Sequence, residues 1–525
     1  MRSISILDCT LRDGGYINSW KFGKNNIEDI IKHLEKSGIE IIECGFIEDK
    51  LYDGDSSVYD NADRIKSFIK KNNTMYVGMI ALGDIDPEKV TPRTLEGIDG
   101  IRLTFHKSEI EEEFRQAQLL IKKGYEIFIQ PVGTSTYSDK ELIDLIERVN
   151  KLHPFAFYIV DTLGTMYPND IQRIFSIIDN NLDDGIRIGF HSHNNLQLSF
   201  SNAQTFMSIS QKRDIIIDSS VFGMGRGAGN LTTELITQYI NNVYGQRYNI
   251  SPLLTIMERY LNKIYVKTPW GYSSPYYLSA INNCHPNYAN YLMMKKTLSI
   301  ESISKILNLI PSNSRSIYDE GLIENLYCEF QSSKIDDFDA ISEISQHLRG
   351  KKILILASGD SIVTKSKEIK KWIDENNDTF IIHINELKKG LPADALFISN
   401  ALKAESTFQQ DLTDIMIIAT SNVKLNETLD VKNIDYSSLL SDMPESDNAG
   451  VMILSLLEKI GIKKVFLAGF DGYHYNSEDY VDYVSKSYLQ KDTDDHNKQI
   501  SYKLQQISQS MQLEFLTPTI YQISM

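Results

Sequence analysis

The chain has 525 residues, of which 42% are hydrophobic and 24% charged, and its 54 Lys and Arg against 70 Asp and Glu give a formal net charge of −16. These globular values exclude a disordered or low-complexity protein, and the length predicts two or three domains. The acidic balance disfavours a nucleic-acid partner, because such proteins usually carry a basic face that replaces the counterions of the phosphates.

The first 220 residues alternate short apolar runs with amphipathic stretches. The runs are apolar on consecutive residues, which is typical of parallel strands buried on both faces. The predicted strands are Ser3–Leu7, Ile39–Cys44, Met75–Ala81, Gly100–Leu103, Glu126–Gln130, Ala156–Val160, Ile186–Phe190 and Ile215–Asp218. The predicted helices between them include Asn26–Ser37, Ser57–Lys71, Ile110–Lys123, Ser138–Leu152, Asn169–Asn180 and Asn195–Ile209.

Eight strands, each followed by enough chain for a crossover helix, indicate a (β/α)8 TIM barrel and therefore an α/β fold. An open, doubly wound parallel sheet shares the same local pattern and is the alternative. The number of units favours the barrel.

The remainder of the chain predicts a helical region, a linker and a second α/β domain. We expect a barrel domain over residues 1–245, a mainly helical extension over 246–331 that completes the catalytic domain, a polar linker over 332–350, and a Rossmann-like domain over 351–525. The elements predicted in the last domain are strands Lys352–Ala357, Thr379–Ile384, Ala395–Ser399, Asp414–Thr420 and Lys464–Ala468 and helices Ser366–Glu375 and Asn448–Gly461.

Polar residues cluster where the predicted barrel strands end. In a barrel the loops that follow the strands gather at one mouth, and active sites form there. The segments concerned are Asp8–Tyr16, Glu43–Gly45, Arg102–His106, Gln130, Asp161–Gly164, His191–Asn195 and Gly223–Asn230. The sequence therefore predicts an active site at the carboxyl ends of the strands.

A divalent metal site is predicted from His191, His193 and Asp13. The two histidines are two residues apart at a strand end, so both imidazoles point the same way and could reach one ion. A carboxylate from Asp13 across the mouth would complete the ligand set. A lone His-x-His pair is more often structural, but its combination with Asp13, and with His106 at the same mouth, is more specific.

Two further residues of the mouth have two interpretations each. Arg12 could form a surface salt bridge with Asp13, or it could face the substrate beside the metal and stabilise an enolate oxygen. Asn230 ends a glycine-rich loop, where it could cap the following helix or bind the metal.

Five ordered motifs resemble the metal-dependent aldolase and acyl-lyase barrels, a family that includes 4-hydroxy-2-oxovalerate aldolase, hydroxymethylglutaryl-CoA lyase and isopropylmalate synthase. The resemblance covers residues 1–240 well and 240–330 loosely, and it is greatest for the 4-hydroxy-2-oxo-acid aldolases. The motifs are Asp8-x-Thr10-Leu11-Arg12-Asp13-Gly14, Glu43, Asp161-Thr162-x-Gly164, His191-x-His193-x-Asn195 and Gly225-x-Gly227-x-Gly229-Asn230.

The resemblance implies a role for each matching residue. Asp13, His191 and His193, with Asn230, would hold Mn²⁺ or Mg²⁺, and Arg12 would stabilise the enolate of a chelated pyruvate unit. Asp8, Glu43 and Thr162 would form a polar floor, and Arg102 and Gln130 would help to bind substrate. No Schiff-base lysine, flavin or pyridoxal phosphate is expected.

One departure from the family concerns the proton-transfer group. The 4-hydroxy-2-oxovalerate aldolases place a catalytic histidine where this chain has Tyr16. Since a tyrosine near pKa 10 is a poor base, either Tyr16 or His106 takes this role, together with Tyr272, or the reaction differs.

The second predicted domain contains a strand–turn–helix motif, Ser358-Gly359-Asp360-Ser361, that could present backbone N–H groups to a phosphate. Asp471 ends a later strand in a second Gly/Asp cluster. The pair faintly resembles pterin-pyrophosphokinase-like and sialyltransferase-like domains, which implies binding of a nucleotide or nucleotide-sugar. An ordinary strand–helix turn is the alternative.

These observations predict a metal-dependent carbon–carbon lyase that acts on a 4-hydroxy-2-oxo acid, with pyruvate enolate as intermediate and an aldehyde as the second product. The alternatives are acyl-CoA-dependent Claisen chemistry on the same barrel and a degenerate barrel that serves the C-terminal domain. We also expect a homo-oligomer. Widely spaced cysteines without a CxxC pair, and the absence of a long apolar run or a signal-peptide core, predict a cytoplasmic protein with no membrane partner.

Overall fold

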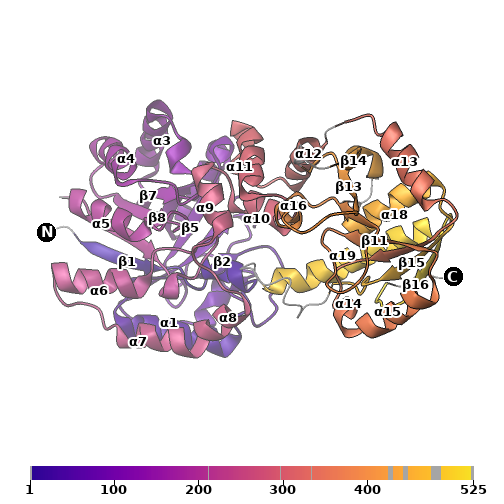
Figure 1. Cartoon of the computed structure of the whole chain (residues 1–525). Helices are drawn as coiled ribbons and strands as arrows, with labels where there is room; N and C mark the ends of the chain where they lie inside the picture. The colour runs from indigo at the N-terminus through magenta and orange to yellow at the C-terminus, as the bar shows by residue number, and fades with distance from the viewer. Residues whose placement is uncertain are drawn as a thin grey trace. The chain divides into compact units, whose positions relative to one another are not determined.

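The structure is a computed structural model that describes residues 3–210, 212–295, 297–332, 334–423, 430–440, 447–473 and 486–521. It divides into two compact units, the first built mainly from residues 1–286 and the second mainly from residues 287–525. Each unit is organised around its own sheet of parallel strands (Figure 1).

The first unit is a closed eight-stranded parallel barrel, as predicted. Neighbouring strands follow one another in sequence, and β1 closes the ring because it pairs with both β9 and β2. Leu7 of β1 lies opposite Ile41 of β2, and Ile4 lies opposite Ile215 of β9. The barrel strands are β1 (Ile4–Asp8), β2 (Ile41–Ile47), β4 (Met75–Ala81), β5 (Gly100–Phe105), β6 (Glu126–Pro131), β7 (Ala156–Asp161), β8 (Arg187–Ser192) and β9 (Ile215–Ser219).

Both faces of the barrel strands are buried, which explains their continuous apolar runs. In β1, Leu7 packs into the barrel interior while Ile6 packs between the strands and the outer helices. Ile216 and Ile217 of β9 divide in the same way, since successive side chains of a strand point to opposite faces. The outer layer comprises α1 (Lys24–Ser37), α2 (Ile110–Lys122), α3 (Asp139–Leu152), α4 (Pro168–Asn181), α5 (Ser199–Ile209) and α6 (Thr233–Tyr244).

The helix predicted over Ser57–Lys71 is wrong. Residues Val58–Tyr59 form a short strand, β3, that pairs with the end of β2, and only one short 3-10 turn, η2 (Ala62–Ser67), follows. The Ser57 hydroxyl donates to the Leu11 carbonyl at 2.6 Å, which fixes the start of this segment against the loop after β1. The pairing of this segment with β2 therefore overrides the helical periodicity of its sequence.

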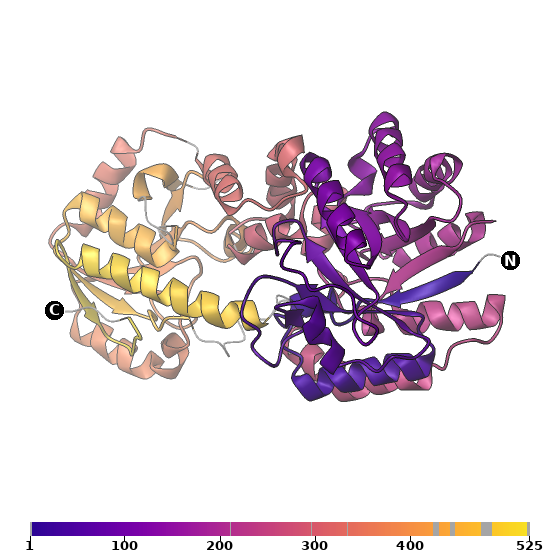
Figure 2. The same cartoon turned by 180° about the vertical axis from the view of Figure 1, so that it is seen from behind.

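Helices follow the barrel, and the domain bounds expected from the sequence stay a prediction. The first unit includes α7 (Ser251–Ile256), which packs along α1 (Figure 2), and a continuous helical run through η6 (Met257–Leu261) and α8 (Asn262–Lys267), then α9 (Ser274–Ile281). The division lies near Pro286, inside the extension predicted over 246–331. The remaining helices of that extension are α10 (Pro286–Met294), α11 (Ile300–Leu309) and α12 (Glu320–Gln331).

Part of the predicted linker over 332–350 is a helix. Residues Phe338–Leu348 form α13, and its Ile344 and Leu348 are buried in the core of the second unit. Polar composition concealed this helix because its apolar residues occupy one face only.

The second unit is a seven-stranded, open, all-parallel sheet with the order β14-β13-β12-β11-β10-β15-β16. Alternate residues of β10 point to opposite faces: Ile353 packs with α13, α18 and α19, whereas Leu354 packs with α14 and α15. The strands are β10 (Lys352–Leu356), β11 (Thr379–Ile384), β12 (Ala395–Ile398), β13 (Met416–Thr420), β14 (Val431–Ile434), β15 (Lys464–Ala468) and β16 (Gln512–Phe515). The helices are α14 (Ser361–Thr364), α15 (Ser366–Glu375), α16 (Ala401–Thr407), α17 (Tyr436–Leu439), α18 (Ala449–Ile460) and α19 (Lys486–Ile507).

The two edge strands, β14 and β16, are absent from the sequence prediction. Edge strands bury only part of their surface, so Val-Lys-Asn-Ile and Gln-Leu-Glu-Phe lack a continuous apolar run. From β10, the strands β11 to β14 follow in chain order on one side of the sheet, while β15 and β16 lie on the other side. The carboxyl ends of β10 and β15 therefore form a topological switch point. A parallel α/β domain is confirmed; its Rossmann-like character stays a prediction.

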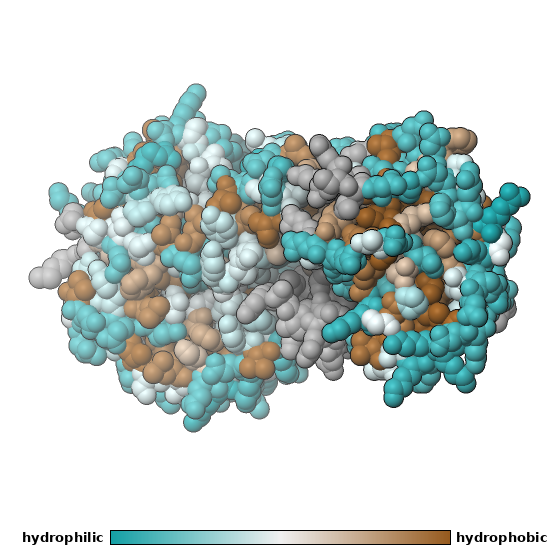
Figure 3. All heavy atoms as spheres, viewed as in Figure 1, coloured by the Kyte–Doolittle hydropathy of each residue, from teal (hydrophilic) through white to brown (hydrophobic). Residues whose placement is uncertain are grey.

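No helix among the described residues is long and apolar enough to cross a membrane. Apolar side chains do reach the surface of the first unit, over α6 and α7, where they lie among hydrophilic residues (Figure 3). Leu235, Val243 and Leu254 are about half exposed there, at 54%, 55% and 50%. The expected homo-oligomer stays a prediction.

Glu113 is a buried carboxyl group on the inner face of α2, and neither of its oxygens has a hydrogen-bond partner among the described residues. Burial, aided by Glu109 and Glu112, raises its pKa to about 8. A raised pKa in the folded state means that stability is lost as the pH rises from about 4.5 through about 8. Glu113→Gln carries no charge, so we expect its melting temperature to exceed that of the parent by about 5 °C at pH 8.5 and by less at pH 5. Equal differences at both pH values would contradict this assignment.

Candidate metal centre

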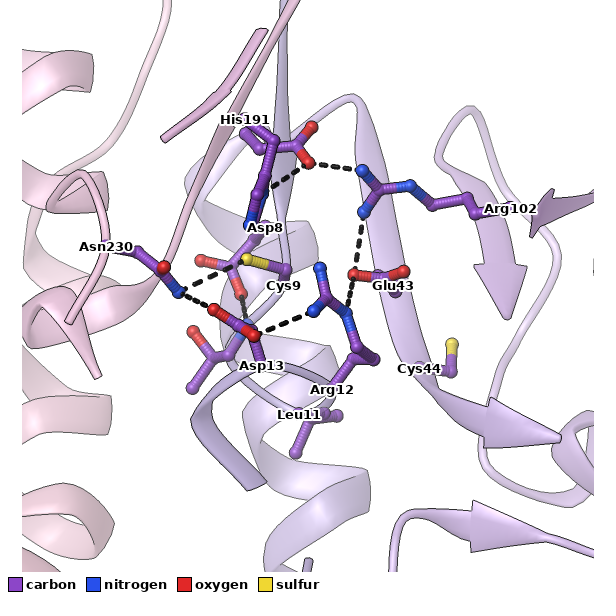
Figure 4. Close-up of polar contacts among 12 residues, drawn as sticks. Asp8, Cys9, Leu11, Arg12, Asp13, Glu43, Cys44, Arg102, His191 and Asn230 are labelled. Carbon is purple, nitrogen blue, oxygen red and sulfur yellow. Dashed lines mark hydrogen bonds and ion pairs between the residues drawn. The ribbon is translucent and has the colours of Figure 1, made fainter. Parts of the chain in front are cut away.

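Three side chains meet at the mouth of the barrel as the sequence predicts. Ligand atoms of Asp13, His191 and His193 all lie within 4.8 Å of one another, and all three residues are buried. His191 belongs to the end of β8 and His193 follows it, so their alternation places both imidazoles on one side, with ring centroids 5.3 Å apart. Asp13 comes from the loop after β1 (Figure 4).

Asp13 is held by a buried ion-pair chain. The Nη1 of Arg12 donates to Asp13 Oδ1 at 2.7 Å, and its Nε donates to Glu43 Oε2 at 2.8 Å. The same Glu43 oxygen lies 2.7 Å from Nη1 of Arg102. The surface salt bridge considered for Arg12 is therefore wrong, because the pair is nearly inaccessible to solvent, with side-chain exposures of 6% and 2%.

The chain continues to the second ligand. Nη2 of Arg102 donates to Asp218 Oδ2, and the same carboxylate oxygen lies 2.9 Å from His191 Nδ1. Alternating charges thus connect Asp13 to His191 without a break (Figure 4). With Asp218 as the acceptor of a hydrogen bond from His191 Nδ1–H, the Nε2 of His191 is left available for a metal.

The electrostatics of the cluster suit a divalent cation. Burial alone would raise the pKa of Asp13, but Arg12, His193, His191 and Asn230 outweigh it and hold this pKa well below its usual range. Burial lowers the pKa of His193 to about 4, so this imidazole is neutral and can donate a lone pair at neutral pH. One carboxylate oxygen and two imidazole nitrogens match the donor preference of a first-row divalent ion.

Asn230 contributes from the glycine-rich loop after β9. Its Nδ2 donates to Asp13 Oδ2, while its buried Oδ1 has no hydrogen-bond partner among the described residues. The backbones of Asn230 and His193 pair in an isolated antiparallel β-bridge. The capping interpretation is wrong, because α6 begins at Thr233 and its N-cap is Thr232. An orphaned acceptor beside the carboxylate fits a metal ligand.

The other residues predicted for the site lie at or near the mouth but not in the cluster. Asp8 accepts hydrogen bonds from Thr10 and Thr233, and burial raises its pKa to about 6. The Thr162 hydroxyl accepts from Gly133 N at 2.8 Å. Gln130, in the amide orientation that satisfies both of its ends, accepts from Arg102 Nε at 2.7 Å.

The side chains of Arg102 and Glu43 are fully buried, so neither is open to a substrate in this structure. The Arg102 guanidinium contacts Glu43, Asp218 and Gln130 and lies 5.0 Å from the centroid of the Tyr158 ring. These contacts hold the guanidinium between Glu43 and Asp218 and make Arg102 a support for the two carboxylates.

The three candidates for proton transfer are not equivalent. Tyr16 lies beside Arg226, and burial raises its pKa although Arg226 opposes the shift. The side chain of His106 is half-buried and makes no hydrogen bond to the cluster among the described residues. Tyr272 is 59% exposed, with its ring 6.3 Å from that of Tyr277.

Sequence reasoning missed three residues. Asp218 was visible only as the polar end of a strand, and Arg226 only as the one charged residue in a glycine-rich loop. His285, between α9 and α10, gives no local signal at all. Burial lowers its pKa to about 2, and Arg226 and His193 lower it further, so it lies within electrostatic range of the site.

Asp218→Asn should weaken the binding of Mn²⁺ to the metal-free protein by about 10- to 100-fold, because the residue fixes the His191 tautomer from outside the ligand shell. Calorimetric titration with Mn²⁺ measures this change. Asp214→Asn is the matched control, since Asp214 directly precedes β9 at the other end of the strand. Equal affinity in the Asp218 variant and the parent would contradict the role.

In the second unit, the predicted phosphate-binding turn is filled by a side chain. Asp471, which follows β15, accepts from Ser361 N at 2.7 Å and from the Ser361 hydroxyl. A Cβ on Gly359 would lie 2.5 Å from the Asp471 carboxyl carbon. Ser358 and Asp360 are exposed beside it. A carboxylate thus stands where an anionic phosphate would bind, and nucleotide binding at this turn stays a prediction.

Comparison with known proteins places the similarity in the first unit. Residues 3–250 match the HMGL-like family model. A 4-hydroxy-2-oxovalerate aldolase from Geobacillus genomosp. 3 is 28% identical over 247 residues, which are 46% of this chain and 72% of that protein. An oxaloacetate decarboxylase from Mycobacterium tuberculosis is 27% identical over 236 residues, 44% of this chain and 68% of the relative.

One solved structure has the same fold over most of its length. The N-terminal domain of a candidate aldolase from Bacteroides vulgatus superposes with a TM-score of 0.51 at 27% identity, and the match covers 57% of this chain and 99% of that one.

Proposed function

We propose that this chain, whose residues 3–250 match the HMGL-like family model, is a divalent-metal-dependent carbon–carbon lyase of the class II type that cleaves a 4-hydroxy-2-oxo acid to pyruvate and an aldehyde. The observation that carries the proposal is the buried cluster of Asp13, His191 and His193 at the barrel mouth. The names of two relatives, 4-hydroxy-2-oxovalerate aldolase and oxaloacetate decarboxylase, both specify a 2-oxo acid.

Asp13, His191 and His193 would hold the ion, with Asn230 Oδ1 as a fourth donor. A divalent ion supplies Lewis acidity, which draws electrons from a keto oxygen and favours the enolate over the reactant. Asp218 and Arg12 keep His191 and Asp13 in place for this task through the hydrogen bonds described above.

Arg12 stabilises the enolate oxygen in this proposal. Its Nε and Nη1 are engaged by Glu43 and Asp13, whereas its Nη2 donates to no described residue. A guanidinium that is fixed by two carboxylates and keeps one free donor is preorganised for negative charge that develops on a substrate oxygen.

Tyr16 suits the delivery of a proton better than its removal. Because burial raises its pKa, the phenol keeps its proton at neutral pH and could return it to the enolate carbon. His106 remains the candidate base for the 4-hydroxyl proton, since Tyr272 is 59% exposed to solvent. The single variants Tyr16→Phe and His106→Gln separate the two steps.

The direct test needs no knowledge of the aldehyde. Purified protein should contain Mn²⁺ or Mg²⁺ after dialysis against either ion, and it should catalyse deuterium exchange into the methyl group of pyruvate. Removal of the ion with EDTA should abolish the exchange, and Mn²⁺ should restore it. Exchange that survives chelation would overturn the metal mechanism, and a metal-loaded protein without any exchange would overturn the lyase assignment.

The two alternatives are tested in parallel. Acetyl-CoA together with a 2-oxo acid would release free thiol if the barrel performs a Claisen condensation. The complete, buried ligand set and its paired outer carboxylates favour an active barrel over a degenerate one.

A further inference from the structure

Arg226 lies at the mouth of the barrel without an acidic partner. The carbon of its guanidinium is 5.5 Å from the centroid of the Tyr16 ring, and no carboxylate of the described residues forms an ion pair with it. By contrast, Arg12 and Arg102 each contact two carboxylates. The side chain of Arg226 is half-buried, so its charge is only partly hydrated.

The loop that carries Arg226 is fixed in place. A Cβ on Gly225 would fall 2.4 Å from Asn230 Nδ2, and one on Gly227 would fall 2.7 Å from Asn195 Oδ1. Asn195 Oδ1 also accepts from Ala228 N at 2.8 Å. Between Gly225 and Gly229, Arg226 is the one residue with a side chain longer than a methyl group. The backbone on either side of it is held against Asn195 and Asn230, the latter being a candidate metal ligand.

The positive charge of Arg226 acts on the site. It opposes the burial that raises the pKa of Tyr16, and it adds to the burial that lowers the pKa of His285. Tyr16 belongs to the loop after β1 and His285 to the helical region that follows the barrel, so the charge of Arg226 acts on both segments.

Ion pairing sets Arg226 apart from the two other guanidiniums of the mouth. Arg12 and Arg102 are held by the buried carboxylates Asp13, Glu43 and Asp218. Arg226 forms no such pair among the described residues, so its charge is open to an anionic ligand.

We propose that Arg226 binds a second anionic group of the substrate, so that the portion of the 2-oxo acid released as the aldehyde carries a carboxylate or a phosphate. The inference rests on the proposed function, because it assumes that the first carboxylate is held at the metal cluster. A guanidinium pairs with either anion through two parallel hydrogen bonds, and a neutral aldehyde offers it none.

Calorimetric binding of 2-oxo acids to the Mn²⁺-loaded protein tests this without turnover. One series adds a distal carboxylate at increasing chain length, 2-oxoglutarate and 2-oxoadipate; a second replaces it with a phosphonate; a third is neutral at that end, 2-oxopentanoate and 2-oxohexanoate. We expect at least one anionic ligand to bind about tenfold or more tightly than its neutral counterpart. The series with the larger ratio identifies the group as carboxylate or phosphate.

Variants assign that preference to the residue. Arg226→Gln should remove the ratio between anionic and neutral ligands, and Arg226→Lys should retain part of it. Arg187→Gln is the matched control: Arg187 also lies over an aromatic ring, 4.0 Å from the centroid of Phe155, but at the amino end of β8. It should leave the ratio unchanged.

The outcomes separate this inference from the proposed function. Equal binding of anionic and neutral ligands at every length, or a ratio that persists in Arg226→Gln, would overturn the role of Arg226 and leave the 2-oxo-acid site standing. Failure of the neutral ligands, the anionic ligands and pyruvate to bind would instead overturn the proposed function.

Discussion

Asp13→Asn should abolish stoichiometric metal binding and lower the deuterium exchange of pyruvate by about a thousandfold or more. The substitution preserves the shape of the side chain but removes the only carboxylate among the three clustered ligands. It also leaves Arg12 with Glu43 as its sole acidic partner, so the guanidinium loses the bond that positions it beside the ion. The effect therefore combines a lost ligand with a displaced cation.

Elemental analysis after dialysis gives the metal content, and proton NMR gives the exchange rate. Asp139→Asn is the control: Asp139 is exposed on α3 and pairs with Arg173, so the variant should behave like the parent protein. An Asp13 variant that keeps its ion and its exchange activity would show that the cluster is not the catalytic centre.

Arg102→Met should destabilise the first unit by about 3 to 5 kcal/mol, which lowers its melting temperature by about 10 °C. The guanidinium is fully buried between Glu43 and Asp218, and methionine fills similar space without charge. Two carboxylates would then remain in the interior without their common partner. Loss of a buried ion-pair partner costs far more than loss of an exposed one, because the remaining charges cannot recover their hydration.

The pH dependence distinguishes this cause from simple loss of packing. Burial alone would raise the pKa of Asp218, but Arg102 and His191 hold it below its usual range. Without Arg102 the carboxyl group can take up a proton, so the destabilisation should shrink as the pH falls from 8 to 5. Thermal denaturation of the metal-free protein measures this, with Arg187→Met as the control. A destabilisation that is constant with pH would point to packing.

The barrel could be predicted because each strand is buried on both faces and therefore reads as a continuous apolar run. The same prediction failed for strands that are buried on one face only and for a strand that forms only by pairing with a distant segment. The polar edge strand Val431–Ile434 has no such run, and the helix expected over Ser57–Lys71 is replaced by a strand that depends on its partner β2. The helix in the predicted linker was hidden by polar residues on its exposed face.

The clustering of Asp13, His191 and His193 could be predicted because these residues occupy short motifs next to strand ends, where spacing alone fixes the direction of their side chains. The residues that support them could not. Asp218 matters through its contact with His191, and Arg226 through its position over Tyr16, and both contacts join segments that are remote in sequence. Arg102 was recognised as important, but its complete burial could be known only from the folded barrel.

The alternating charges from Asp13 to His191 also constrain how this protein can diverge. Reversal or loss of any one interior charge leaves its two neighbours repelling or unpaired. We therefore expect selection against single replacements at Arg12, Glu43, Arg102 or Asp218, although these four residues lie outside the candidate ligand set. Descendants are therefore expected to inherit these positions as a block, and a designer who transplants the ion-holding trio into another scaffold must carry the whole block with it.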